Sequence, residues 1–324
     1  MDYLSDSLSA LNEWLIEPAM VEIAVNPDGK IWVLRRGDIA MVETGKKLEA
    51  NKITGLIQQM AAKTHAKVGN DKLLISGSVV YNDRSIRAQG LLAPAVHGGK
   101  GAIALRLHSS LDIGQIQLNY LHGKSQSMTE MRTKKMAELD DLIAGSRLME
   151  ALEFCVANRL NILIAGGTDT GKTVALRKII SLIDEKDRII TIEDAAELYP
   201  GQPNCVSLIA DRGSEIRSTD RLLEASLRMR PDRLIVGEIR GKEAMTFLEA
   251  INTGHGGSMS TIHAETPELA LDRLAIAAAR SGVPMTYENL LDYIGRTIDV
   301  IIQAGRKGAD RGIVEIYRPD RRAA

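Results

Sequence analysis

One stretch of eight residues constrains the fold more than any other: residues 166–173, which read Gly-Gly-Thr-Asp-Thr-Gly-Lys-Thr. This stretch fits the G-x-x-x-x-G-K-[ST] pattern of a phosphate-binding loop, or P-loop. The apolar run before it predicts a buried strand over residues 161–165, and residues 174–183 behind it are apolar at helical spacing. In this context the loop N–H groups and the helix N-terminus bind phosphate, Lys172 reaches the β- and γ-phosphates, and the Thr173 hydroxyl holds Mg²⁺.

Composition bounds what can surround this loop. A chain of 324 residues, 44% of them hydrophobic, has room for two domains with real cores. A formal net charge of −1 and 3% aromatic residues argue against a dedicated nucleic-acid-binding protein, so no direct sequence-specific nucleic-acid binding is expected. No apolar run approaches the roughly 18 residues that span a bilayer, and the acidic start is unlike a signal peptide. We therefore expect a soluble cytoplasmic protein, with peripheral contact to a membrane complex left open.

Residues 1–122 are predicted to form an N-terminal α+β domain on a mainly antiparallel sheet. Alternating or apolar runs between turn residues predict its strands, and apolar residues at helical spacing predict its helices. The expected helices are residues 1–18, 46–65 and 111–122, and the expected strands are residues 21–25, 30–34, 39–42, 73–80, 85–92 and 102–107.

Two arginines, Arg87 and Arg106, stand in the last two of these strands. One interpretation is that both are solvated strand charges. The other is that they reach across to a nucleotide held by the second domain, because a guanidinium group suits phosphate. The residues alone leave both interpretations open.

A polar stretch begins the predicted linker, residues 123–145, which includes an expected helix at 127–144. From residue 146 to 324 the pattern becomes helices alternating with apolar strands, which predicts an α/β domain with a mostly parallel sheet. Its expected strands are residues 161–165, 188–192, 233–236 and 257–262, and its expected helices are residues 147–156 and 174–183.

Ionisable residues follow three of these strands: Glu193, Glu238 and His263. In sheets of this kind ligands bind beyond the carboxyl ends of the strands, at the edge that carries the P-loop. Acids there can polarise an attacking water or hold Mg²⁺ through its waters. Arg228 and Arg230, just before the third strand, are either surface charges or arginine fingers offered to a neighbouring subunit.

Four blocks, in order and spacing, resemble the hexameric traffic ATPases of the type II/type IV secretion superfamily. They are the P-loop, the acidic box Ile-Glu-Asp-Ala-Ala-Glu-Leu at residues 192–198, the block at residues 227–241 that contains Arg-Pro-Asp and Gly-Glu-Ile-Arg, and the histidine box at residues 253–264. The type IV secretion branch is the more similar one, because the two cysteines of the chain cannot form the four-cysteine zinc motif common in the type II branch.

This resemblance implies a RecA-like second domain, ATP and Mg²⁺ as ligands, and a ring of six subunits in which hydrolysis changes the angle between the domains. By position, Lys172 and Thr173 would bind phosphate and Mg²⁺, Glu238 would be the Walker B acid, Glu193 would lie near the attacking water and His263 would sense the γ-phosphate. Whether Glu193 or Glu238 is the general base stays open. The residues implied in catalysis are Lys172, Glu193, Arg228, Arg230, Glu238 and His263, those in nucleotide binding are Gly166, Gly167, Thr168, Asp169, Thr170, Gly171, Lys172, Thr173, Val174, Arg87 and Arg106, and those in metal binding are Thr173 and Glu238.

The resemblance also implies a place for the protein. Rings of the family dock on the cytoplasmic face of the inner membrane, against secretion-channel components and other secretion ATPases. The expected function is therefore an ATPase that drives substrate transfer or pilus assembly in a type IV secretion or conjugation system. Two alternatives are a pilus-retraction motor on the same scaffold and a nucleotide-gated scaffold with little turnover.

Two positions depart from the pattern of the family. Asp169 stands where relatives commonly have Gly, and Val174 stands where they commonly have Thr. Asp tolerates the left-handed backbone conformation better than most residues, so the shape of the loop can survive. A carboxylate beside a triphosphate should repel it unless a cation screens it, and on that basis the sequence predicts that Asp169→Gly tightens nucleotide binding.

Overall fold

The structure is a computed structural model that describes residues 3–64, 69, 72–108, 114 and 116–320. Its N-terminal sheet has six antiparallel strands in the order β3-β2-β1-β6-β5-β4. The strands are β1 (Met20–Val25), β2 (Lys30–Arg35), β3 (Val42–Lys47), β4 (Leu74–Tyr81), β5 (Arg84–Leu92) and β6 (Gly101–Leu107). Helices α1 (Tyr3–Leu8), α2 (Asn12–Leu15) and α3 (Ala50–Lys63) lie on one side of this sheet, with a 3-10 turn, η1 (Ser9–Leu11), between α1 and α2.

Four predicted elements of this domain differ from the structure. The first helix is interrupted by η1, and α3 begins at Ala50 rather than at residue 46. The third strand is β3 rather than residues 39–42, because β3 pairs with β2 through polar and exposed residues that carry no apolar alternation. The helix expected over residues 111–122 is absent from 116–122, and residues 111–113 and 115 lie outside the described part of the chain.

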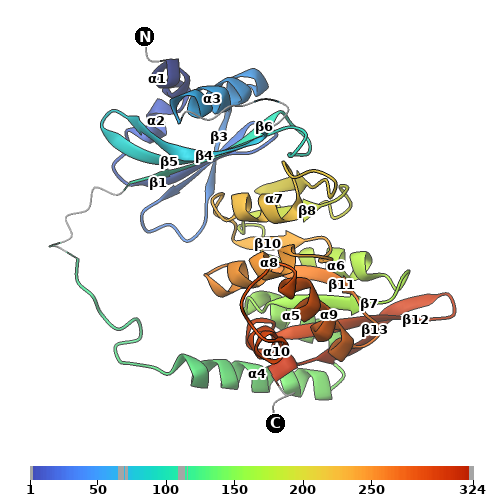
Figure 1. The fold of residues 1–324 in the computed structure, drawn as a ribbon. Helices are drawn as coiled ribbons and strands as arrows, with labels where there is room; N and C mark the ends of the chain where they lie inside the picture. Colours follow the sequence, from blue (N-terminus) through green and yellow to red (C-terminus); the bar gives the residue numbers. More distant parts are fainter. Residues whose placement is uncertain (1–2, 65–68, 70–71, 109–113, 115, 321–324) are drawn as a thin grey trace.

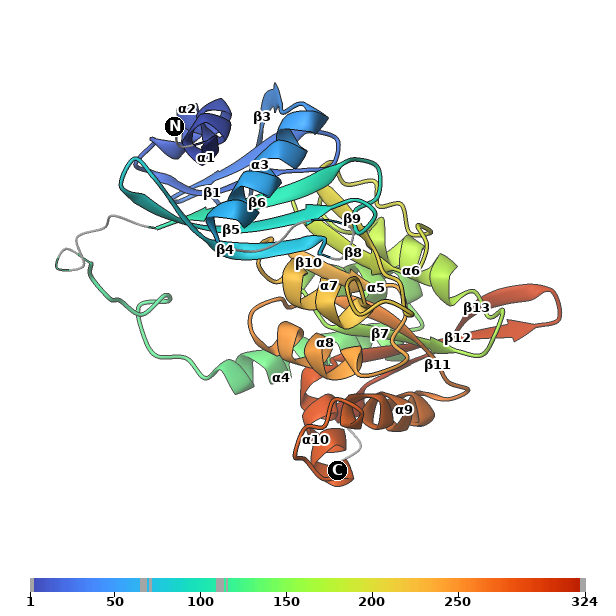
Figure 2. The ribbon, with the colours of Figure 1, turned by 45° about the horizontal axis from the view of Figure 1, so that its top comes forward.

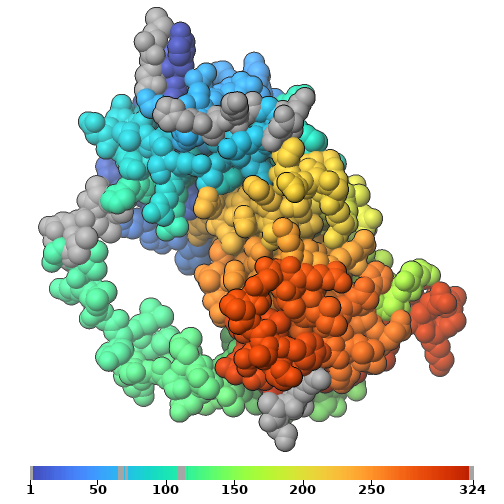
Figure 3. Space-filling view, in the orientation of Figure 1, coloured from blue at the N-terminus to red at the C-terminus, as the bar shows by residue number. Residues whose placement is uncertain are grey.

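Residues 116–127, in the segment that joins the two domains, stand away from the rest of the chain (Figure 3). Ile116, Leu118 and Leu121 are exposed there, so a helix would have no surface on which to pack an apolar face. At its end Ser127 caps α4 (Met128–Ala144) by accepting a hydrogen bond from the backbone N–H of Glu130. Helix α4 packs against α5 (Leu148–Ala157) of the second domain.

The second sheet has seven strands in the order β13-β12-β7-β11-β10-β8-β9, all parallel except β13. The strands are β7 (Ile162–Gly166), β8 (Ile189–Glu193), β9 (Cys205–Ile209), β10 (Arg233–Val236), β11 (Met259–His263), β12 (Val300–Lys307) and β13 (Asp310–Tyr317). The further helices are α6 (Lys172–Ile180), α7 (Thr219–Ser226), α8 (Glu243–Asn252), α9 (Pro267–Ala279) and α10 (Tyr287–Thr297). The predicted fold class, an antiparallel α+β domain followed by a P-loop α/β domain, is confirmed.

Helices cover both faces of this sheet, because the side chains of its strands alternate between two apolar cores. Ile162 and Ile164 of β7 pack with α4, α5 and α6, whereas Leu163 and Ala165 face the core that α7 to α10 share. The four site-bearing strands β7, β8, β10 and β11 run parallel, so their carboxyl ends meet at one edge. None of the helices in the described ranges is long and apolar enough to cross a bilayer.

The two domains are joined by backbone pairing as well as by apolar packing. Residues 95–97 of the first domain lie along β9, the edge strand of the second sheet, with Val96 bridged to Leu208. The His97 N–H donates to the carbonyl of Ser207, and the Ile209 N–H donates to the carbonyl of Ala95, both at 2.9 Å. Residues 95–97 therefore extend the sheet of the second domain by a short antiparallel bridge.

Candidate active site

The P-loop joins β7 to α6 in the conformation that its glycines allow. Gly171 has φ +87°, and Asp169 has φ +61°, so Asp169 takes the left-handed conformation that the sequence analysis expected it to tolerate. A Cβ on Gly166 would lie 2.9 Å from the carbonyl oxygen of Ala304 on β12, so a larger residue would push the loop off the sheet. The loop therefore curls tightly over the end of β7, with the N-terminus of α6 behind it.

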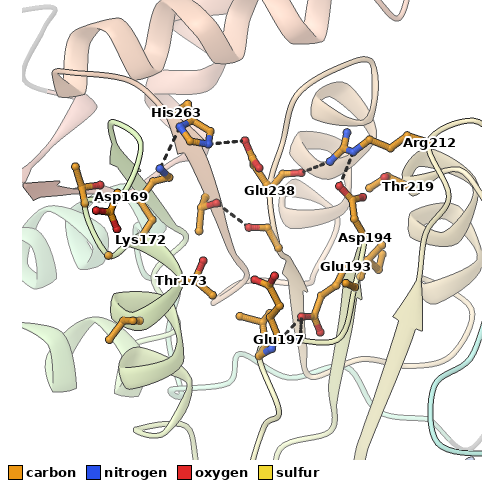
Figure 4. Close-up of a pocket in the computed structure, with 18 of the residues that line it drawn as sticks. Asp169, Lys172, Thr173, Glu193, Asp194, Glu197, Arg212, Thr219, Glu238 and His263 are labelled. Atoms are coloured by element: carbon orange, nitrogen blue, oxygen red, sulfur yellow. Dashed lines mark hydrogen bonds and ion pairs between the residues drawn. The ribbon is translucent and has the colours of Figure 1, made fainter.

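Lys172 folds back onto this loop (Figure 4). Its Nζ donates to the carbonyl oxygens of Gly166 at 3.0 Å and Gly167 at 2.7 Å, and it lies 3.2 Å from Nδ1 of His263. Burial lowers the pKa of Lys172 below its usual value. The ammonium group thus lies in the centre of the P-loop, where it can contact phosphate oxygens.

His263, the last residue of β11, connects Lys172 to Glu238. Burial, followed by the charge of Lys172, lowers the pKa of His263, which keeps the imidazole neutral at pH 7. Because Nδ1 accepts from Lys172, we assign the ring proton to Nε2, which lies 3.3 Å from Oε1 of Glu238. The three side chains form a line from the P-loop to the end of β10.

Glu238 has one oxygen without a hydrogen bond. Its Oε2 is bound by Arg240, whereas Oε1 is buried, lies 3.3 Å from Nε2 of His263 in poor alignment and accepts no hydrogen bond. Burial would raise the pKa of Glu238, but the hydrogen bond and charge of Arg240, together with the charge of Arg212, leave that pKa below its usual value. The site thus contains an ionised carboxylate with an oxygen that could accept a proton from water or hold a water bound to Mg²⁺.

Glu193 has no such free oxygen. Its Oε1 accepts from the hydroxyl of Thr191 at 2.9 Å, and its Oε2 accepts from the backbone N–H groups of Glu197 and Leu198, both at 2.9 Å. The side chain is buried at the end of β8. These bonds hold the backbone of the acidic box in place.

These groups belong to residues that line a cavity of about 460 Å³. Its lining includes the predicted residues Asp169, Thr170, Gly171, Lys172, Thr173, Val174, Glu193, Glu238 and His263. It also includes Arg212 and Arg311, which the sequence analysis missed. Arg212 donates from Nε to Asp194 at 2.7 Å and from Nη2 to the carbonyl of Glu238 at 3.3 Å, and the strand β9 that leads to Arg212 was itself not predicted.

Gly167 and Thr168 lie on the other side of the loop, in a second cavity that Glu238 and His263 also line. Four predicted arginines lie elsewhere. A separate pocket of about 390 Å³ between the domains is lined by Arg87 and Arg106 from the first domain and by Arg228 and Arg230 from the second. In a single chain these side chains therefore do not line the P-loop cavity.

The side chains around the cavity also indicate how Mg²⁺ could bind. Across the described ranges, no group of three or more His, Cys, Asp or Glu side chains is arranged to hold a metal ion. Thr173 and Glu238, the two predicted metal-binding residues, line the same cavity. This fits an ion that keeps several waters and arrives with the phosphates of a nucleotide, as Mg²⁺ does.

Comparison with known proteins identifies the family. A sequence model described as "Type II/IV secretion system protein" matches residues 98–305, which is more than half of the chain. The chain belongs to the type II/IV secretion system protein family.

Relatives of this family member carry type IV secretion and conjugation names. It is 31% identical to "Conjugal transfer protein TrbB" of Rhizobium radiobacter over 97% of the chain and 87% of that protein. It is 30% identical to "Protein VirB11" of the same organism over 91% of the chain and 88% of that protein. The crystal structure of the VirB11 ATPase from the Brucella suis type IV secretion system, in complex with sulphate, has a TM-score of 0.86 at 26% identity and covers 98% of this chain and 95% of that one. The predicted resemblance to the type IV secretion branch is confirmed.

Proposed function

We propose that this type II/IV secretion family protein hydrolyses ATP at the P-loop cavity and powers a type IV secretion or conjugation system. The observation that carries the proposal is the line from Lys172 through His263 to Glu238, which ends in a buried carboxylate oxygen without a hydrogen bond. The names of the relatives support the same function, and the VirB11 ATPase of Brucella suis binds sulphate, an analogue of phosphate.

Each side chain has a role in this proposal. The loop N–H groups and Lys172 bind the phosphates, and Thr173, with Glu238 through a water, would hold Mg²⁺. Mg²⁺, when bound, would neutralise charge on the phosphates. Glu238 accepts the proton of the attacking water, and His263, neutral and bonded to Lys172, senses the γ-phosphate. Glu193 keeps the acidic box in place, which favours Glu238 over Glu193 as the base.

The pocket between the domains that four arginines line, here called the arginine pocket, supports an assembly of several subunits. Arg87, Arg106, Arg228 and Arg230 line a concave surface away from the P-loop of their own chain, which suits them to the nucleotide of a neighbouring copy. We therefore propose a homo-hexameric ring that docks at the cytoplasmic face of the inner membrane, against channel components and other secretion ATPases.

A measurement of turnover against assembly tests this function. We expect ATP hydrolysis per subunit to rise with protein concentration as light scattering detects a species near six times 35.3 kDa. Lys172→Ala should abolish the activity at every concentration. Full activity in a monomer would remove the ring from the proposal. Nucleotide binding without turnover in an assembled ring would instead favour the gated scaffold.

A further inference from the structure

Asp169, the unusual residue of the P-loop, does not face the cavity as a bare charge. Its Oδ2 accepts from Nη2 of Arg311 at 2.6 Å and from Nη1 of Arg306 at 3.2 Å. The Nε of Arg311 also donates to the backbone carbonyl of Asp169 at 3.0 Å. The hydrogen bond and charge of Arg311 lower the pKa of Asp169. The sequence-based expectation of repulsion presupposed an unpaired carboxylate, and that premise is wrong.

Both arginines belong to the hairpin of β12 and β13, which extends beyond the rest of the second domain (Figures 1 and 2). Arg306 and Arg311 are directly opposite each other in the strand register. Two like charges in such a pair repel each other, and the carboxylate of Asp169 between them offsets that repulsion. The P-loop and the hairpin are therefore held together at this point by one anion and two cations, a local charge of +1.

The two arginines differ in one respect. Arg311 lines the P-loop cavity and Arg306 does not. The side chain of Arg311 also passes over the loop, since a Cβ built on Gly171 would lie 3.5 Å from its Cδ. Arg311 thus lies at the mouth of the cavity, beside the backbone that would surround phosphate.

The lining of the cavity carries more carboxylates than cations, so a cation at its mouth matters for the binding of anionic phosphates. Five carboxylates line it, Asp169, Glu193, Asp194, Glu197 and Glu238, against three cations, Lys172, Arg212 and Arg311. Arg212 is already paired with Asp194 and lies 3.5 Å from Glu243. Arg311 shares its carboxylate with Arg306, so it retains attraction for a further anion. A guanidinium group held in a fixed orientation is well suited to phosphate oxygens.

We propose that Arg311 is a nucleotide-binding residue and that Asp169 is the positioning residue that holds it at the mouth of the cavity, toward the phosphates. This inference rests on the proposed function, because it takes the P-loop cavity as the nucleotide site. It reverses the sequence-based expectation for Asp169: loss of the carboxylate weakens nucleotide binding, because Arg311 loses its orientation and is repelled by Arg306.

The test is an equilibrium titration of the assembled protein with a fluorescent ADP and with a non-hydrolysable ATP analogue, each with Mg²⁺. We expect Arg311→Gln to weaken binding about five- to tenfold, the size of one charge-assisted contact that is partly exposed. Arg306→Gln is the matched control. It also removes one positive charge from the hairpin and one hydrogen bond to Asp169, but Arg306 does not line the cavity. Its effect should stay below about twofold.

Asp169→Asn should weaken binding about threefold, and the double variant Asp169→Asn with Arg311→Gln should be no weaker than Arg311→Gln alone. A purely structural effect of Asp169 would instead add to the loss at Arg311.

Arg311→Lys keeps the charge but not the paired contacts, so its affinity should fall between wild type and Arg311→Gln. Wild-type affinity should also fall more steeply with salt than that of Arg311→Gln.

Three results would overturn the inference: unchanged affinity in Arg311→Gln, equal losses in Arg306→Gln and Arg311→Gln, or tighter binding in Asp169→Asn. Wild-type protein that binds nucleotide without hydrolysing it would contradict the proposed function while leaving this inference in place, because the titration measures binding alone. Wild-type affinity in Lys172→Ala would remove the cavity as the nucleotide site, and both proposals with it.

Discussion

Glu238→Gln should lower kcat for ATP hydrolysis by about 10²- to 10⁴-fold, the usual contribution of a positioned general base. The amide has nearly the same shape, so it can keep contact with Arg240, but it cannot accept a proton from water. Nucleotide affinity should stay within a few fold of wild type, because Lys172 and the P-loop are untouched. Turnover and analogue binding, measured on the same assembled sample, separate these two effects.

Glu193→Gln is the control, because it makes the same chemical change at the other candidate base. The amide can no longer accept bonds through two equally charged oxygens from Thr191, Glu197 and Leu198. We therefore expect a loss of about 1–3 kcal/mol in the free energy of unfolding, with a smaller effect on kcat than Glu238→Gln causes. A larger loss of turnover in Glu193→Gln, at unchanged stability, would make Glu193 the base and sink this assignment.

The sequence carried enough information to predict the edge of the sheet where the site lies. The P-loop constrains β7 and α6, and residues such as Glu193 and His263 come directly after the strands predicted over residues 188–192 and 257–262. Because parallel strands end at one edge, local patterns sufficed to bring these residues together. The family that the comparisons identified is the one that the order and spacing of the four blocks predicted.

Three features were not predicted, each for a different physical reason. Arg311 meets Asp169 across 142 positions, and no local pattern of the hairpin reveals that pairing. The roles of Glu193 and Glu238 could not be separated from sequence, because the distinction proposed above rests on hydrogen bonds to the acidic-box backbone. Strand β9 was missed, since two of its five residues, Cys205 and Ser207, weaken the apolar signal.

A second large effect should come from Glu22, which lies on β1 among the charges of the arginine pocket. Its side chain is buried, its Oε2 lies 3.7 Å from Nε of Arg230, and Arg106 is its partner in the strand register. Burial raises the pKa of Glu22 from 4.5 to about 7, although Arg230, Arg106 and Arg188 oppose the rise. Folding therefore favours the protonated, neutral form of this carboxyl group.

The sign of the pH dependence follows from proton binding. Between pH 4.5 and about 7 the folded protein holds a proton at Glu22 that the unfolded chain has released. The contribution of Glu22 to the free energy of unfolding is therefore fully present below pH 4.5, falls as the pH rises to about 7, and stays low above it. The full loss is on the order of 3 kcal/mol, since each pH unit of difference in pKa corresponds to about 1.4 kcal/mol.

Glu22→Gln keeps the shape of the side chain in its neutral form and should remove this loss. In urea unfolding, we expect the variant to exceed wild type in stability by about 2 kcal/mol more at pH 8 than at pH 5. Glu43→Gln, which removes an exposed carboxylate from the same sheet, should stay within about 0.5 kcal/mol of wild type. If Glu22→Gln were instead less stable than wild type at pH 8, the attraction of the arginines would outweigh burial. Glu22 would then be an ionised partner of Arg230 that ties the two domains together.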